Sequence, residues 1–217
     1  MSDAQKTALI EYDTDHGKVK LSPAIVKRYL VSGKAELVSD TEVIMFMQLC
    51  RYQGLNPFLR EAYLIKYGSS PATMVTGKDT FTKRAASIKE CQGYNAGIIV
   101  GAERRKGSAL FDGEILLGGW AEVFRENWRE PLHVEVSLSE YMKKNSEGKP
   151  TRAWAEMPAT MIRKVALVQA LREAFPDKYQ GLYDAAEIQT VDVKLPDEPV
   201  KVEAVDEAGV SEAFDKS

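Results

Sequence analysis

The chain has 217 residues, 44% of them hydrophobic, which is enough for one domain with a sizeable core and too few for two large ones. Its two cysteines, Cys50 and Cys91, lie far apart, which argues against a disulfide framework or a thiolate metal cage and favours a reducing cytoplasm. The net charge is −3, but residues 192–217 alone carry −5, so residues 1–191 carry +2 and a polyanion site there would need a local cluster of cations.

The first half of the chain predicts a helix followed by two short strands. Ser39 and Glu42 have capping-box spacing ahead of an apolar series, and Gly54 ends this helix. A tight corner is expected at 54–57, because the residue before a proline is pushed out of the helical conformation. Alternating residues then predict strands at 61–67 and 72–75.

The second half predicts a helix, three strands and a second helix. Thr76 is expected to cap a helix that runs to about Glu90. Strands at 94–100, 114–125 and 132–137 are expected to form an antiparallel meander, with a basic loop around residues 104–106. Residues 158–175 are apolar almost all round a helical wheel, which predicts a long buried helix that Pro176 ends. No apolar run approaches membrane-spanning length, so no membrane association is expected.

Several kinds of chemistry find no support in the sequence. Thr76, Gly77 and Lys78 look like the end of a phosphate-binding P-loop, but Ala72 stands where that motif needs glycine and Asp79 where it needs a hydroxyl. The two histidines have no partner at metal-ligand spacing, and the acids of residues 1–191 are scattered. No cofactor, metal site or catalytic residue is predicted, although a metal-dependent nuclease stays open as an alternative.

The cations of the long helix are the first candidate binding residues. Arg163, Lys164 and Arg172 lie in an otherwise apolar helix, and a buried charge needs a partner. Phosphates of a nucleic acid would serve as such partners. The alternative is an internal ion pair, for instance with Glu173 or Asp184.

A second set of candidates lies on the preceding helix and in a polar loop. Lys78 opens a helix whose free N–H groups can receive an anion, and Lys83 and Arg84 follow on the same helix. The loop at 143–152 contains Lys149 and Arg152 and leads to Trp154, which could stack on an unpaired base. For the helix the alternative is ordinary capping by Asp79, and for the loop it is a solvated turn.

These residues belong to a set of motifs that resembles a known family. The motifs occur in the order GLNPF with REAYL (54–64), VTGKDTF (75–81), GGWAEVFR (118–125), Trp154, and PATMIRKVALVQALREAF leading to GLYDAAE (158–187). Together they are similar to the Bet family of phage recombination proteins, which is Red beta-like and falls within the RecT superfamily. Ala159, Thr160 and Val165 depart from the pattern, since Red beta has basic residues there.

The resemblance implies an α+β fold, an antiparallel sheet packed against helices. It implies a protein that binds single-stranded DNA and anneals it to a complement without ATP, and that also binds the annealed duplex intermediate. It implies a homo-oligomer in a ring or filament, in the cytoplasm of a bacterial host. It also implies a DNA-backbone role for the three cations of the long helix. A phage exonuclease or a host single-strand-binding protein is the expected partner.

The expected division of the chain has three parts. Residues 1–20 form a flexible arm, 21–190 the annealing domain, and 191–217 a disordered acidic tail that is rich in Pro, Val and Glu. A further alternative to annealing is a non-catalytic adaptor that acts through this tail.

Overall fold

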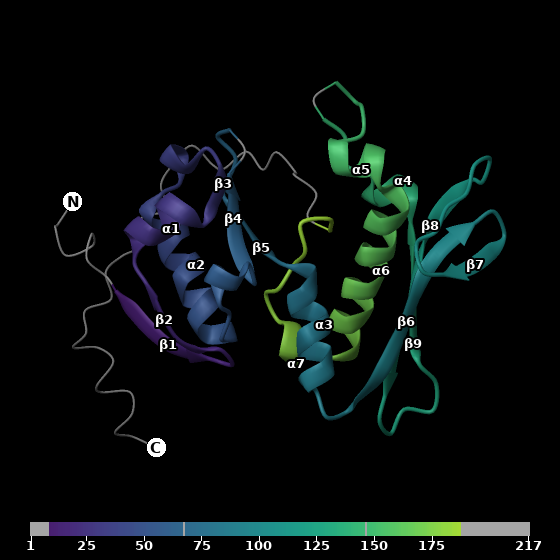
Figure 1. The fold of residues 1–217 in the computed structure, drawn as a ribbon, viewed down its shortest axis with the longest axis horizontal. Coiled ribbons are helices and arrows are strands. Elements are labelled where there is room, and N and C mark those ends of the chain that lie inside the picture. The colour runs from purple at the N-terminus through teal and green to yellow at the C-terminus, as the bar shows by residue number, and fades with distance from the viewer. Residues whose placement is uncertain (1–8, 67, 146, 188–217) are drawn as a thin grey trace, which may run out of the picture.

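The computed structural model describes residues 9–66, 68–145 and 147–187, and it is α+β as expected. Its elements fall into two halves that lie side by side along the longest axis (Figure 1). The first half comprises β1 (Ile10–Thr14), β2 (Gly17–Leu21), α1 (Pro23–Tyr29), β3 (Val31–Gly33), η2 (Ala35–Leu37), α2 (Asp40–Gln53), η3 (Pro57–Leu59), β4 (Ala62–Lys66) and β5 (Thr73–Thr76). The second comprises α3 (Lys78–Ser87), β6 (Cys91–Val100), β7 (Glu103–Lys106), β8 (Leu116–Arg125), β9 (Leu132–Ser137), α4 (Leu138–Tyr141), α5 (Arg152–Glu156), α6 (Pro158–Ala174) and α7 (Pro176–Tyr179).

Residues 10–21 form a hairpin in place of the expected flexible arm. β1 and β2 pair antiparallel, and Tyr12, Val19 and Leu21 are buried against the core. The Tyr12 hydroxyl donates to the carbonyl of Leu55 at 2.8 Å, which fixes the hairpin to the corner after α2. The boundary expected at residue 20 therefore falls inside β2. The expected acidic tail lies outside the described residues.

The helix α2 forms as its sequence predicts. The Ser39 hydroxyl accepts from the N–H of Glu42, and the Glu42 carboxylate accepts from the N–H of Ser39, which completes the capping box. Gly54 ends the helix in the left-handed conformation at φ 61°. The same Glu42 also accepts from Lys66 Nζ and Ala72 N–H, so one carboxylate joins α2 to the β3-β4-β5 sheet.

Each of the two larger sheets contains the expected strands and one more. β3 pairs parallel with β4, and β4 pairs antiparallel with β5. The second sheet has the order β7-β6-β8-β9 with every neighbouring pair antiparallel, so the expected antiparallel meander forms as β6-β8-β9, and β7 adds a strand beyond β6. The segment expected as a basic loop is β7, an edge strand.

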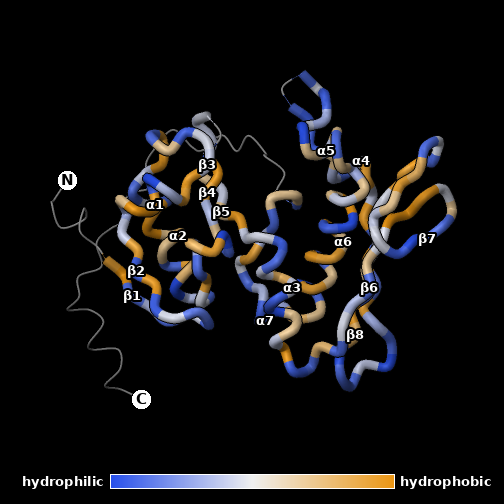
Figure 2. Tube along the Cα trace, viewed as in Figure 1, coloured by the Kyte–Doolittle hydropathy of each residue, from blue (hydrophilic) through white to orange (hydrophobic). Residues whose placement is uncertain are grey.

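The helix α6 covers one face of this second sheet, as Figure 1 shows. Gly119 of β8 allows this close packing, because a Cβ there would lie 2.5 Å from the carbonyl oxygen of Ile162. One apolar cluster joins both halves, and Figure 2 shows hydrophobic segments in their strands and hydrophilic ones in the turn after β8 and the loop before α5. Within the described residues, no helix combines the length and hydrophobicity needed to cross a membrane.

Candidate nucleic-acid interface

An open groove runs along α3, between the two halves. It consists of two adjoining hollows of about 780 Å³ and 460 Å³, which share Glu61, Thr80 and Lys83. The tip of the β1–β2 hairpin, the end of α2, the η3 corner, α3 and Lys178 form its walls. We call it the α3 groove. Its charged residues are Arg60, Lys78, Lys83, Arg84, Lys89, Lys178, Asp13, Asp15, Glu61, Asp79 and Glu90.

The start of α3 is fixed by close backbone packing. Gly77 is the N-cap, its N–H donates to the carbonyl of Glu61, and a Cβ on it would lie 2.7 Å from the carbonyl oxygen of Arg60. Glycine is therefore needed here for space. The expected cap by Thr76 is wrong, because Thr76 ends β5 and its N–H donates to the carbonyl of Tyr183.

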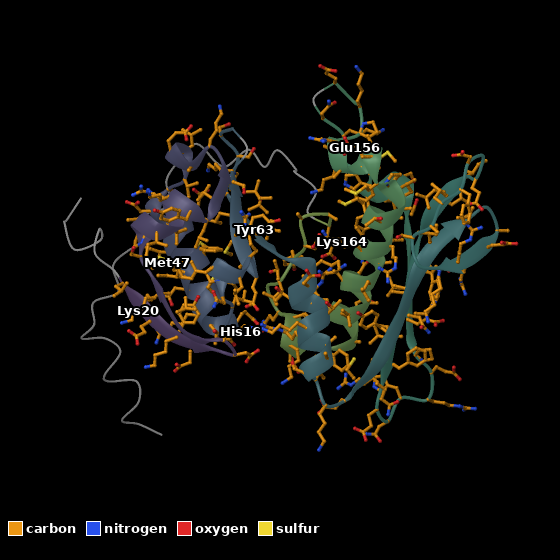
Figure 3. The ribbon with its side chains drawn as sticks, in the orientation of Figure 1. His16, Lys20, Met47, Tyr63, Glu156 and Lys164 are labelled. Carbon is orange, nitrogen blue, oxygen red and sulfur yellow. The ribbon has the colours of Figure 1, made fainter. Side chains whose placement is uncertain are left out.

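Lys83 is engaged inside the groove. Its Nζ lies 2.8 Å from Glu61 Oε1, 3.5 Å from Asp15 Oδ2 and 2.9 Å from His16 Nε2. The hydrogen bond to Glu61 raises the pKa of Lys83. Figure 3 shows His16 at the end of the hairpin nearest α3, so Lys83 fastens the hairpin tip to the helix.

Arg84 joins α3 to two other segments, the end of α2 and Lys178. Its guanidinium donates to the side chain and carbonyl of Gln53 and to the carbonyl of Lys178, at 2.6–2.8 Å. Burial lowers its pKa. Since all of these acceptors are uncharged, and no carboxylate of the described chain accepts from Arg84, its positive charge contributes to the field of the larger hollow.

Lys78 and Arg60 are the cations of the groove best placed to receive a ligand. The Lys78 side chain is 44% exposed, and the carboxylate nearest to it, Asp79, is 3.9 Å away and itself 98% exposed. Arg60 is exposed, and no acid among the described residues pairs with it. Arg60 was not among the predicted site residues, although it follows the corner predicted at 54–57. Lys89 and Lys178 were not predicted either, because only tertiary packing brings them to the groove.

The three cations of α6 do not line the groove. Lys164 Nζ lies 2.7 Å from Asp184, and Arg172 makes two hydrogen bonds of 3.0 and 2.7 Å with Glu187. These two carboxylates are 1% and 7% exposed, so the internal ion-pair alternative describes Lys164 and Arg172. Arg163 Nε donates to the carbonyl of Ala96 at 3.2 Å, and in the described chain it has no ion pair.

The acids that pair with Lys164 and Arg172 belong to the segment that follows α7. Asp184 and Glu187 fix residues 182–187 against α6, and Lys143 Nζ adds a hydrogen bond to the carbonyl of Ala185. Figure 3 labels Lys164 on the side of α6 that faces this segment. Lys164 and Arg172 of α6 therefore hold a part of the chain that the sequence motif GLYDAAE supplies.

The loop before α5 lies away from the groove. Lys149 pairs with Glu147 at 3.2 Å and Arg152 with Glu156 at 2.8 Å, and all four side chains are largely exposed. Exposed pairs of this kind contribute little stability, so both cations remain accessible. Trp154 is 1% exposed and packs in the core, so the expectation that it stacks on a base is wrong for this conformation.

The described residues include no group of three or more His, Cys, Asp or Glu side chains that could hold a metal ion. Proteins that hold single-stranded nucleic acid combine cations along a groove with aromatic side chains on which bases stack, and Tyr63 lies beside Arg60 and Lys78 in the smaller hollow. The RecT family matches residues 19–199, and the chain belongs to this family of phage recombinases that anneal DNA strands. A search of curated proteins finds no match.

Proposed function

We propose that this protein binds single-stranded DNA and anneals complementary strands without consuming ATP, in phage or prophage recombination. The observation that carries the proposal is the match to the RecT family over residues 19–199, which is most of the chain. The proposed role is that of a DNA-binding recombinase that makes and breaks no covalent bond.

The α3 groove supports the proposal as the place for the strand. Arg60 is exposed there, Lys78 has only the exposed Asp79 nearby at 3.9 Å, and Arg84 adds a charge that forms no ion pair within the described residues. Phosphates of a single strand would bind these cations and release counterions. Arg163, Lys149 and Arg152 stay candidates for further backbone contacts, because none of them has a buried acidic partner in the described chain.

Annealing needs no nucleotide hydrolysis in this mechanism. Base pairing and stacking release free energy by themselves, on the order of 1.4 kcal/mol per base-pair step. The protein lowers the repulsion between phosphates and concentrates the strands, so that two complements meet more often. Protomers are proposed to lie side by side in a ring or filament, and a phage exonuclease or host single-strand-binding protein to supply or share the strand.

The test is duplex formation between two labelled complementary oligonucleotides with the purified protein, in the absence of ATP and metal. We expect the duplex to form faster than with the strands alone, and every strand to keep its full length. A rate equal to that of the free strands would contradict annealing. Shortened, end-labelled products after magnesium is added would support the nuclease alternative instead.

A further inference from the structure

Apolar side chains line the smaller hollow of the α3 groove beside its exposed cations. Leu59, which is 55% exposed, and Tyr63 lie on the wall of this hollow together with Arg60 and Lys78. Neighbouring Phe58 is 52% exposed. Adjacent apolar side chains that stay exposed in a hollow beside cations are a candidate ligand-binding surface, because a ligand that covers them regains the free energy of burial.

The η3 corner holds Leu59 outward through its own hydrogen bonds. Asn56 Oδ1 accepts from the N–H of Phe58, and the Asn56 carbonyl accepts from the N–H groups of Leu59 and Glu61. The N–H of Asn56 in turn donates to Glu61 Oε2 at 2.7 Å. Burial of Pro57 and Leu55 anchors the corner, so Leu59 cannot turn into the core without breaking these contacts.

Arg60 is held in a conformation that a residue with a side chain rarely adopts. Its φ is 61°, in the left-handed region, which costs on the order of 1 kcal/mol for a residue other than glycine. The close approach of Gly77 to the Arg60 carbonyl fixes this backbone. The chain thus places a guanidinium and an apolar wall next to each other at the cost of local strain.

We infer that the smaller hollow is a base-binding subsite, in which an unpaired nucleobase lies against Leu59 and Tyr63 while Arg60 and Lys78 hold the adjoining phosphate. The volume of about 460 Å³ falls within the range of sites for small organic groups. The inference rests on the proposed function and extends it, because it names the base, and not only the backbone, as a ligand.

The subsite would distinguish single strands from duplex. A base presents its flat face to a side chain only when it is unstacked, and every base has such a face, so the contact tolerates any sequence. The held base would leave the hollow when it pairs, since a stacked base pair hides that face. Duplex should therefore bind more weakly than either strand.

The experiment compares a thymidine oligonucleotide with a strand of equal length that has the same sugars and phosphates but no bases. We expect the wild-type protein to bind the thymidine strand at least about fivefold more tightly, given the usual strength of one stacked base. Tyr63→Ala and Leu59→Ser should bring this ratio close to one. Tyr63→Phe should keep it, because the ring remains.

Two controls separate base contact from folding and from backbone binding. Tyr52→Ala removes an aromatic that is 79% exposed on α2 and lies outside both hollows, and it should leave the ratio at the wild-type value. The salt dependence of binding should be unchanged in Leu59→Ser, since no phosphate contact is lost. Leu59 is exposed, so its variant tests the subsite even if Tyr63→Ala unfolds.

Equal binding of the two strands by the wild-type protein would overturn the base subsite and leave annealing intact. A ratio that stays at the wild-type value in both Tyr63→Ala and folded Leu59→Ser would overturn it as well. Absence of any annealing by the wild-type protein would instead overturn the proposed function, and the subsite with it.

Discussion

Lysine and arginine side chains take three different roles in this structure, and the nearest hydrogen-bond acceptor of each side chain decides its role. Lys164 and Arg172 pair with buried acids, and Arg84 donates to neutral acceptors in the chain. Lys78 and Arg60 face the groove, where the only acid of the described residues close to either is the exposed Asp79, 3.9 Å from Lys78. This last group can exchange water for a phosphate without first breaking an internal hydrogen bond, so it should dominate binding.

Removal of Arg172 should destabilise the fold. Arg172→Ala leaves the carboxylate of Glu187, which is 7% exposed, without its partner, and loss of one member of a buried pair costs about 3 kcal/mol. It also removes the contact of the guanidinium with the Tyr183 ring, 4.7 Å from its centroid. Urea denaturation measures the change. If the variant keeps its stability but loses single-strand binding, Arg172 contacts DNA and the ion pair is secondary.

Removal of the exposed groove cations should weaken DNA binding and leave the fold intact. Lys78→Gln and Arg60→Gln should each reduce the slope of log K against log salt by about 0.7, the value for one phosphate contact on a single strand. Their free energy of unfolding should change by less than about 0.5 kcal/mol. Arg129→Gln is the matched control, since Arg129 is exposed after β8 and lines neither hollow. An unchanged slope in both groove variants would show that the strand binds outside the α3 groove.

At the scale of elements, the sequence predicted the bounds of a helix best where the residues at its own ends contain the start and stop signals. The capping box and Gly54 bound α2 as predicted, and α6 ends before Pro176. The edge strand β7 was missed, because its cations predict a loop and only its pairing with β6 makes it a strand. The hairpin of residues 10–21 was missed for a related reason, since Tyr12 and Val19 gain their burial from α2 and the rest of the core.

Glu42 joins α2, β4 and the segment before β5, and this contact should make stability depend on pH. Burial alone would raise the pKa of Glu42, but hydrogen bonds from Ala72, Lys66 and Ser39 lower it to about 2. Because the pKa is lower in the folded chain than its ordinary 4.5, the stabilisation is complete above pH 4.5 and is lost as the pH falls towards 2.

Glu42→Gln should therefore lose on the order of 2 kcal/mol of stability at pH 7. It should also lose less stability than the wild type between pH 5 and pH 3. Thermal unfolding at several pH values measures both effects. Glu36→Gln, at an exposed position on η2, is the control. Parallel curves for wild type and Glu42→Gln would show that Glu42 does not set the pH dependence.

At the scale of the whole molecule, the groove exists only because four separate parts of the chain meet. The hairpin tip, the corner after α2, α3 and Lys178 are joined by Lys83, Glu61 and Arg84. Acids and cations are nearly balanced within it, so its affinity for DNA should respond to charge elsewhere on the chain. Residues 192–217 carry a net −5 and are the largest such contribution.

Truncation after Val191 should raise the affinity for single-stranded DNA, because it removes negative charge that opposes a polyanion. Annealing should persist. The effect should be larger in low salt than in 1 M salt, where charges are screened within about 3 Å. Titration of a labelled oligonucleotide at both salt concentrations provides the measurement. Loss of annealing in the truncated, folded protein would favour the adaptor alternative.

The sequence by itself determined the class of fold, the family, the bounds of α2 and α6 and the cations that had to find partners. Caps, hydrophobic period and the cost of a buried charge act over a few residues, so they can be read along the chain. Only the tertiary structure decided that Asp184 and Glu187 take Lys164 and Arg172, that Trp154 is buried, and that Arg60 and Leu59 meet Lys78 at one hollow. Those outcomes depend on which distant segments pack together, and no local pattern of residues specifies that.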